Sequence, residues 1–365
     1  MKLKDYMGSM RALISERIDE EIQVFASECK GRGSELGYVF PILAEYGHAG
    51  KMLRGALVCM SSSLFGNSPE PSAAALDIAA AMELFQSGLL VHDDIMDKDD
   101  TRRGRPTMHR LFESAEKALS ATHPTDPQAM NFASLGESLG ICAGDIYYFI
   151  AWKLINKHFK TIGDLVSREL VDVCLAQMRD VRIGALPAFP SLEEIIDVYA
   201  FKTARYTITM PLCCGALLEE RGDAIPHLEE LGINLGILFQ LQDDYLGLFG
   251  DAETLGKPIG SDLREGKKTP FIILLQPRLS AEETSRFASI FGNETITDQD
   301  IAFVRRLISA HGVDTEIKAL AESYAAKASS VLSALDAAKA TASNTGKNIL
   351  LMLREFIEYS LARTC

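Results

Sequence analysis

Several features are scarce or missing in this chain of 365 residues. It has one tryptophan and seven cysteines, and no two cysteines form a CxxC pair. We therefore expect neither a disulfide framework nor a cysteine metal site, and interpret the cysteines as reduced, buried thiols of a cytoplasmic protein. The amphipathic, acidic N-terminal stretch lacks the apolar core of a signal peptide. No apolar run reaches about 18 residues, so we expect no stable membrane insertion.

Alternating β-branched segments are also missing, which makes a sheet unexpected. Helical periodicity dominates instead. The sequence predicts an all-α protein, with residues 1–365 forming a single large helical bundle around a central cavity. The net charge of -13 argues against nucleic acid as a partner. An anionic substrate is still compatible with this charge, because a local basic cluster with bound cations outweighs the global balance.

The predicted helices fall into a regular series along the chain. Pro211 is expected to kink the helix that carries Lys202. The Pro-rich stretch 122–128 and the Gly-rich stretch 250–269 are expected to be loops. The expected helices cover about 5–29, 50–65, 71–97, 131–158, 161–184, 191–219, 225–249, 297–310, 313–339 and 345–362.

A first acidic cluster ends the long apolar run 71–97. Asp93 and Asp97 are four residues apart, so their carboxylates share a helix face and repel unless a cation lies between them. Such oxygen ligands suit Mg²⁺, which bridges protein carboxylates to phosphate oxygens. Asp94 points about 100° away and is expected to matter less. Taken alone, this motif also fits an acidic, solvated helix end.

A second acidic cluster, beginning at Asp243 and Asp244, ends the apolar run 225–249 in the same way. Two acidic pairs, each at the end of a helix that reads as buried, are hard to explain as solvated surface. In a helical bundle they could face each other across a central cavity, where bundles build metal sites.

Basic residues accompany both clusters. A diphosphate needs cations and guanidinium groups to hold it and to stabilise it as a leaving group. Each basic residue alone is typical of a surface charge. Their position beside two acidic motifs is what indicates a diphosphate-binding site. They are Lys51, Arg54, Arg102, Arg103, Lys202, Lys257, Lys267 and Lys268.

Taken together, these motifs resemble the trans-isoprenyl diphosphate synthase family. The matching segments are GKMLR (50–54), LLVHDDIMDKDDTRRGRPTMHR (89–110), AGD (143–145), QMRD (177–180), FKTARYTITMP (201–211), FQLQDDYLGLFGD (239–251) and GKPIGSDLREGKKT (256–269). The resemblance implies a bundle of about ten core helices around a deep cavity, a homodimer, and two small-molecule substrates: isopentenyl diphosphate and an allylic diphosphate.

The resemblance also implies roles for individual residues. Asp93, Asp97 and Asp243 match the ligands of three Mg²⁺ ions. The allylic diphosphate site matches Arg102, Lys202, Lys257 and Lys267. The isopentenyl diphosphate site matches Lys51, Arg54, Gln86 and Arg103. Polar groups near the developing cation match Thr203, Tyr206 and Gln240.

The chain departs from the family pattern at two places. Gly247 stands where the second motif usually has a third aspartate, so we do not count residue 247 as a ligand. The segment 111–130 is longer than is typical and contains the Pro-rich stretch.

Product length is expected to depend on the helix before Asp93, along which the growing chain runs in this family. A large aromatic residue five positions before the first aspartate typically stops growth at fifteen carbons, and here that position is Gly88. Leu89 is only moderately bulky, and Phe85 lies one turn deeper. We predict that Phe85 forms the floor of the pocket that holds the growing chain, and that geranylgeranyl diphosphate is the main product. The alternative is that Phe85 packs in the core and another helix supplies the floor.

Other readings stay open at this point. A terpene cyclase shares the first motif but usually carries an Asn/Ser/Glu metal motif second. An HD-type phosphohydrolase would use His92 and Asp93 as a metal dyad. A non-catalytic partner subunit of a prenyl synthase would lack some of the motif residues, and this chain keeps nearly all of them.

Overall fold

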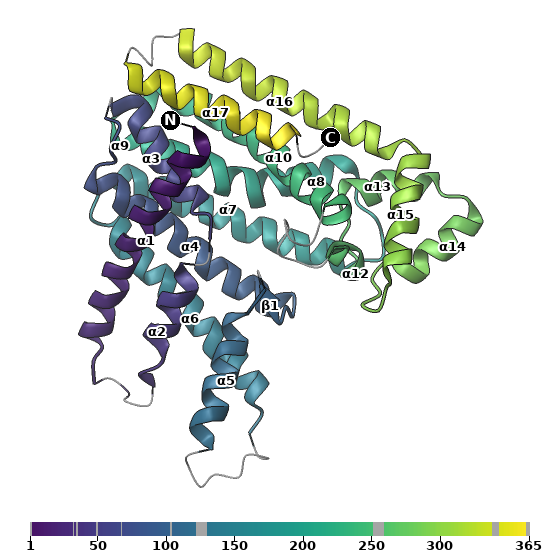
Figure 1. Ribbon diagram of the computed structural model, residues 1–365, viewed down its shortest axis with the longest axis horizontal. Coiled ribbons are helices and arrows are strands. Elements are labelled where there is room, and N and C mark those ends of the chain that lie inside the picture. The colour runs from purple at the N-terminus through teal and green to yellow at the C-terminus, as the bar shows by residue number, and fades with distance from the viewer. Residues whose placement is uncertain are drawn as a thin grey trace. The chain divides into compact units, whose positions relative to one another are not determined.

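The computed structural model (Figure 1) describes most of the chain, and its contacts divide the chain into two compact units. The first unit comprises Met1–Ser62 with Pro69–Gly163, and the second comprises Ser63–Ser68 with Asp164–Cys365. The described residues are 2–31, 33, 36–48, 50–66, 68–102, 104–121, 130–250, 259–337 and 343–362.

The first unit is helical apart from one two-stranded hairpin. Helix α4 lies at its centre and packs against α1, α2, α5 and α6. Ser72 accepts a hydrogen bond from the Ala75 N–H and fixes the start of α4. The elements are α1 (Leu3–Glu28), α2 (Val39–Gly47), α3 (Leu53–Gly66), α4 (Ala73–Met96), β1 (Thr101–Arg102), β2 (Arg105–Pro106), α5 (Met108–Ser120) and α6 (Phe132–Ile155).

Glycines on α6 allow close packing against the end of α4 that carries the first acidic motif. A Cβ at Gly144 would collide with the His92 imidazole, and a Cβ at Gly140 would lie 2.9 Å from the Ile95 side chain. His92 Nε2 is 3.1 Å from the Ile141 carbonyl oxygen on the same helix. This packing fixes the position of α4 relative to α6 just before its acidic end.

The second unit is built around α10, which packs against η3, α9, α16 and α17. Figure 1 shows α16 and α17 side by side. The elements are α7 (Lys160–Ala185), α8 (Leu192–Val198), η3 (Tyr199–Thr209), α9 (Met210–Leu218), η4 (Gly222–Ala224), α10 (Ile225–Phe249), α12 (Ser261–Arg264), α13 (Pro270–Leu275), η5 (Gln276–Arg278), α14 (Ala281–Ile290), α15 (Asp298–Ala310), α16 (Val313–Ala337) and α17 (Asn344–Ala362).

The backbone around Pro211 has an unusual form. Residues 192–218 stay helical throughout, but Tyr199–Thr209 forms a π-helix that leads directly into α9, with Pro211 in the first turn of α9. Proline lacks an N–H group and its ring crowds the preceding turn of an α-helix. Wide π turns are one way to accommodate this, and they occur frequently at functional sites. Lys202 and Thr203 lie within this π segment.

The expected series of helices is confirmed, with additions. The sequence did not predict α2, α5, α13 and α14, which are 9, 13, 6 and 10 residues long. Helices of ten residues or fewer, such as α2, α13 and α14, give too few turns for a clear apolar period. The stretch expected as a loop at 250–269 contains α12, whereas the loop expected at 122–128 lies outside the described residues.

The cysteine prediction was wrong in part. Cys59, Cys213 and Cys214 are buried free thiols, as expected, and burial raises the pKa of Cys59 to about 12. Cys142 and Cys174 are exposed free thiols. Both lie on helices with exposed apolar side chains, so an apolar sequence context did not imply burial.

Two helices, α4 and α6, are long and apolar enough to cross a membrane, judged by length and composition alone. The expectation of no spanning helix rested on uninterrupted apolar runs, which charged residues such as Asp77 and Glu83 break. The most apolar window of α4 is 67% buried and that of α6 is 44% buried. Packing of α4 in the core accounts for its apolar character.

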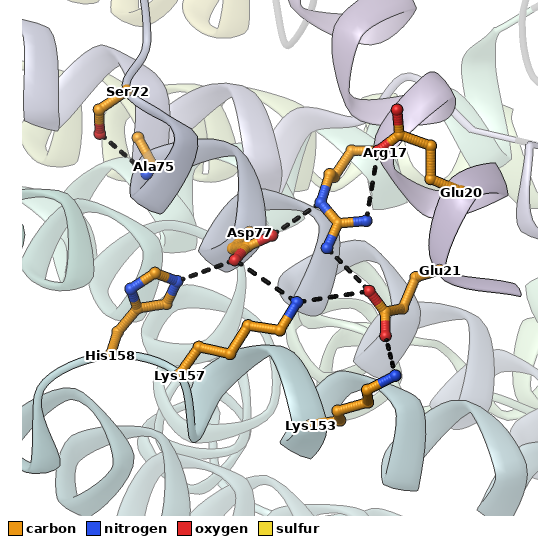
Figure 2. Close-up of polar contacts among 9 residues, drawn as sticks. All are labelled: Arg17, Glu20, Glu21, Ser72, Ala75, Asp77, Lys153, Lys157 and His158. Carbon is orange, nitrogen blue, oxygen red and sulfur yellow. Dashed lines mark hydrogen bonds and ion pairs between the residues drawn. The ribbon is translucent and has the colours of Figure 1, made fainter. Parts of the chain in front are cut away.

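A polar cluster joins α1, α4 and α6 at the start of α4 (Figure 2). Arg17 donates to Asp77 at 2.7 Å and to Glu21 at 2.8 Å, and Lys153 lies 2.7 Å from Glu21. His158 Nε2 lies 3.1 Å from Asp77. Burial alone would raise the pKa of Glu21, but Lys153 and Arg17 lower it to about 2. The cluster therefore stabilises the unit through ionised carboxylates.

This cluster predicts a pH-dependent contribution to stability. Because the folded pKa of Glu21 is depressed, its contribution is present above the normal pKa of 4.5 and is lost as pH falls toward 2. Glu21→Gln should therefore lower the free energy of unfolding by about 1–3 kcal/mol near neutral pH. The difference from wild type should shrink in acid, as measured by urea unfolding. Glu20, whose side chain is 63% exposed and 3.5 Å from Arg17, provides the control: Glu20→Gln should change little at any pH.

Candidate active site

The first acidic motif lies at the C-terminal end of α4. Asp93 is half-buried, whereas Asp97 is exposed and caps the helix, with its backbone N–H bonded to the Asp93 carbonyl at 2.8 Å. Negative charge is unfavourable at a helix C-terminus, and the two carboxylates also repel each other. The local structure thus presents two accessible carboxylates whose proximity favours a bound cation.

Asp94, between them in sequence, has a different environment. Its carboxylate is wholly buried and accepts hydrogen bonds from the Tyr46 hydroxyl at 3.0 Å and from Arg102 Nε at 2.5 Å. Burial raises the pKa of Asp94, against the opposing effect of Arg102. The Arg102 Nη2 atom lies 4.0 Å from Asp93. Asp94 thus holds Arg102 beside the motif, a role that its direction on the helix did not predict.

The second acidic motif, at the end of α10, also combines an accessible aspartate with a buried one. Asp243 is exposed, and Asp244 is buried with 2% of its surface accessible. The Tyr199 hydroxyl donates to Asp244 Oδ2, and Gln240 Nε2 donates to Asp244 Oδ1 at 3.1 Å. Thr203 Oγ1 in turn donates to Gln240 Oε1 at 2.9 Å. The buried carboxylate thereby fixes the orientation of the Gln240 amide and the Thr203 hydroxyl.

Burial raises the pKa of Asp244 to about 7, with a further contribution from the nearby charge of Asp262. Asp262 lies next to Gly247 of the second motif. A Cβ added at Gly247 would lie 3.0 Å from Asp262 Oδ2. A carboxylate therefore lies beside the position where the family motif usually has its third aspartate, although residue 247 itself supplies none.

The basic residues of the second unit have distinct environments. Lys202 Nζ lies 2.5 Å from Asp180 on α7, and Lys267 Nζ lies 3.9 Å from Asp262. Asp262 raises the pKa of Lys267, which therefore stays charged. Lys268 is buried and donates to the backbone carbonyl of Ile183 in the last turn of α7 and to those of Leu186 and Ala188 just after it. Lys268 stabilises the end of this helix and is not available to a substrate.

In the first unit, Lys51 is exposed just before α3 and Arg54 is half-buried in its first turn. Buried Glu83 of α4 accepts a hydrogen bond from the Gly55 N–H at 2.8 Å. This bond ties the start of α3 to α4 and fixes the position of Arg54. Gln86 is half-buried one turn further along α4.

The remaining predicted residues divide into two sets. Tyr206 is buried within η3, in the same unit as Lys202, Thr203, Gln240 and Asp243. Arg103 and Lys257 lie outside the described residues. Sequence reasoning did not identify the partners that hold the predicted residues in place, which are Tyr46, Glu83, Asp180, Tyr199 and Asp262.

The predicted product-length residues contact aromatic side chains of α6. Phe85 is wholly buried, with its ring centroid 5.5 Å from Trp152 and 6.3 Å from Tyr148. A Cβ at Gly88 would lie 2.5 Å from the Tyr148 ring and 2.8 Å from the Gly144 carbonyl. Gly88 is therefore a close-packing position in which a larger residue does not fit without movement of α6. Leu89 is half-buried.

His92 does not act as half of a metal dyad with Asp93 in this arrangement. Its ring packs edge-on against Tyr148 with 5.4 Å between centroids, and its Nε2 faces the Ile141 carbonyl oxygen. Among the residues that the structure describes, no group of three or more His, Cys, Asp or Glu side chains is placed to hold a metal by itself. Mg²⁺ does not require such a group, because it binds through one or two carboxylates together with substrate phosphates.

Comparison with known proteins agrees with this geometry. The sequence pattern of the Polyprenyl synthetase family matches residues 41–308. The chain is 32% identical over 297 residues to a short chain isoprenyl diphosphate synthase of Methanocaldococcus jannaschii, covering 79% of each protein. It is 33% identical over 264 residues to a geranylgeranyl diphosphate synthase of Saccharolobus solfataricus, covering 72% of this chain and 74% of that protein.

A solved structure shows the same fold. The geranylgeranyl pyrophosphate synthase of Corynebacterium glutamicum, crystallised with isoprenyl diphosphate and magnesium, superposes with a TM-score of 0.80 at 27% identity. The match covers 96% of this chain and 98% of that one. The family expected from the motifs and the all-α fold class are both confirmed. The chain belongs to the polyprenyl synthetase family of trans-isoprenyl diphosphate synthases.

Proposed function

We propose that the protein condenses isopentenyl diphosphate with an allylic diphosphate, head to tail and in trans, with release of pyrophosphate. One observation supports this most strongly. Both acidic motifs present accessible carboxylates (Asp93, Asp97 and Asp243) and each buries a neighbouring aspartate that holds other polar side chains in place. Carboxylates arranged in this way suit the binding of divalent cations, which stabilise a departing diphosphate.

A divalent metal is expected at the accessible carboxylates. The Corynebacterium glutamicum relative was crystallised with magnesium, and Asp93, Asp97 and Asp243 have the hard oxygen ligands that Mg²⁺ prefers. We propose that these three residues hold three Mg²⁺ ions when diphosphate is bound. The ions would neutralise negative charge on the leaving diphosphate.

The protein's own side chains would share the remaining tasks. Arg102, Lys202 and Lys267, with Lys257, would hold the allylic diphosphate. Lys51, Arg54, Gln86 and Arg103 would hold isopentenyl diphosphate. Thr203 and Gln240, oriented by Asp244, and Tyr206 would direct their oxygens toward the developing allylic cation.

The reaction proceeds by cleavage of the allylic C–O bond, attack by the isopentenyl double bond on the resulting cation, and loss of a proton. We propose that the departing pyrophosphate takes this proton, since no side-chain base is evident among the described residues of the two motifs. Water must be excluded, because it would trap the cation. The stretch 250–269, which contains Lys267, is the proposed closing element.

Several broader properties belong to the same proposal. The chain would act as one domain over residues 1–365, as a cytoplasmic homodimer, without nucleic acid and without stable membrane insertion. A terpene cyclase is less favoured, because the acidic second motif with its following lysines suits chain elongation. A non-catalytic partner subunit is less favoured, because the described motif residues are retained.

We propose geranylgeranyl diphosphate as the main product, the product named for relatives in Saccharolobus solfataricus and Corynebacterium glutamicum. Chromatography of the products formed from isopentenyl diphosphate with dimethylallyl, geranyl or farnesyl diphosphate in turn tests this proposal. A twenty-carbon product should accumulate with each primer. A main product of another length would overturn the proposed chain length while leaving the reaction type intact.

The two basic groups predict opposite kinetic effects. Lys51→Ala and Arg54→Ala should raise KM for isopentenyl diphosphate about tenfold or more, with less effect on the allylic substrate, because each removes a charge-assisted bond. Lys202→Ala should do the reverse. Steady-state kinetics with each substrate varied in turn separates the two outcomes. Equal changes for both substrates in all three variants would show that the two sites are wrongly assigned.

A further inference from the structure

Positions on α6 that are four residues apart form a ridge that packs against α4 and α5. Gly136, Gly140 and Gly144 occupy this ridge next to α5 and the acidic end of α4, where a side chain would collide with His109, Ile95 or His92. The next two positions, Tyr148 and Trp152, are aromatic and contact α4 further from its acidic end. The ridge thus changes from no side chain to large rings within one helical turn.

Tyr148 is the first of these rings when one moves along α4 away from Asp93. Its ring contacts His92 at 5.4 Å and Phe85 at 6.3 Å between centroids, and fills the space beside Gly88. Its hydroxyl oxygen lies 3.4 Å from His92 Nδ1. Tyr148 therefore covers the two turns of α4 that precede the acidic motif.

Burial distinguishes Tyr148 from Phe85. Phe85 is wholly buried beneath Tyr148 and Trp152, whereas Tyr148 is only half-buried. A hydrocarbon chain advancing along α4 away from Asp93 would meet Tyr148 before Phe85, which is inaccessible unless a neighbouring side chain moves. The ring at this depth comes from α6, and Gly88 leaves the room for it.

We propose that Tyr148 is the specificity-determining residue that limits product length. This inference rests on the proposed prenyl transfer and on growth of the chain along α4. The aromatic ring that other members place at the position of Gly88 is supplied here by the facing helix. A five-carbon isoprene unit is comparable in size to the part of the tyrosine side chain that Tyr148→Ala removes.

The test compares product chain lengths of purified variants by reverse-phase chromatography. Tyr148→Ala should lengthen the main product by at least one isoprene unit, and Tyr148→Leu, which keeps an apolar contact with Phe85, should shift it in the same direction. Tyr148→Phe should leave the length unchanged, because it keeps the ring. Trp152→Ala, one turn deeper on the same ridge, should leave it unchanged as long as Tyr148 is present.

The outcomes separate this inference from the reaction itself. Unchanged product length in a Tyr148→Ala or Tyr148→Leu variant that still turns over would overturn the role of Tyr148 alone. A longer product from Phe85→Ala with Tyr148 intact would also overturn it and would assign the floor to Phe85. A wild-type protein that forms no elongated product would overturn the proposed function together with this inference.

Discussion

Asp93→Ala and Asp243→Ala are each expected to lower turnover by on the order of 1000-fold or more, because each removes an accessible carboxylate from a site that stabilises the leaving diphosphate. Neither change should lower the free energy of unfolding by more than about 1 kcal/mol, because neither side chain is buried. Loss of the Asp93 carboxylate removes a 4.0 Å contact with Arg102 but also relieves its repulsion of Asp97. Initial rates at saturating Mg²⁺ and urea unfolding together measure both effects.

Glu230→Ala is a matched control for Asp243→Ala. Glu230 is an exposed carboxylate on the same helix, α10, several turns before the motif. Its loss should leave turnover within about twofold of wild type, as surface substitutions usually do. Activity within a few-fold of wild type in both aspartate variants would remove the assignment of Asp93 and Asp243 as metal ligands.

Asp94→Ala is expected to have the largest effect on stability. It leaves the Arg102 guanidinium, whose side chain is 16% exposed, without its buried partner, and it removes the acceptor for Tyr46. Breaking a pair of this kind costs about 3 kcal/mol. Turnover should also fall, because Arg102 is no longer held beside Asp93. This expectation replaces the milder effect inferred from the direction of Asp94 on the helix.

The controls for Asp94 lie within the same cluster. Asp99 is 3.6 Å from Arg102 and 24% exposed, so Asp99→Ala should cost less than about 1 kcal/mol. Asp94→Asn keeps a hydrogen-bond acceptor and should fall between wild type and Asp94→Ala. The double variant Asp94→Ala/Arg102→Met should recover part of the lost stability, because it removes the guanidinium charge together with its buried partner. An Asp94→Ala protein as stable as wild type would contradict the anchoring role.

The sequence was sufficient to predict the long helices and to suggest Asp93, Asp97 and Asp243 as candidate ligands, for physical reasons. Long apolar periods identify helices, and a spacing of four places Asp93 and Asp97 on one face. The same spacing says nothing about which residues other elements bring to Asp94. Tyr46 precedes it by 48 positions, and Tyr199 precedes Asp244 by 45. Such long-range partners depend on helix packing and carry no local signal.

The sequence also could not predict that adjacent residues of one type have different environments. Lys267 and Lys268 are adjacent, yet Lys267 lies beside Asp262 while Lys268 is bonded to backbone carbonyls at and just after the end of α7. Gly88 illustrates the same limit. Its lack of a side chain suggested open space, whereas the Tyr148 ring from α6 fills that space. A sequence shows where a side chain is absent, but it does not show which residue of another helix fills the space.

Prenyl transfer by the purified protein alone is the most direct test of the central claim. The protein is incubated with isopentenyl diphosphate and geranyl diphosphate, with and without Mg²⁺, and the prenyl products and released pyrophosphate are measured. The account predicts an elongated prenyl diphosphate and equimolar pyrophosphate for each unit added, both lost on chelation and restored by Mg²⁺. Absence of elongated product with this primer and with dimethylallyl or farnesyl diphosphate, in a folded protein with Mg²⁺ present, would contradict it.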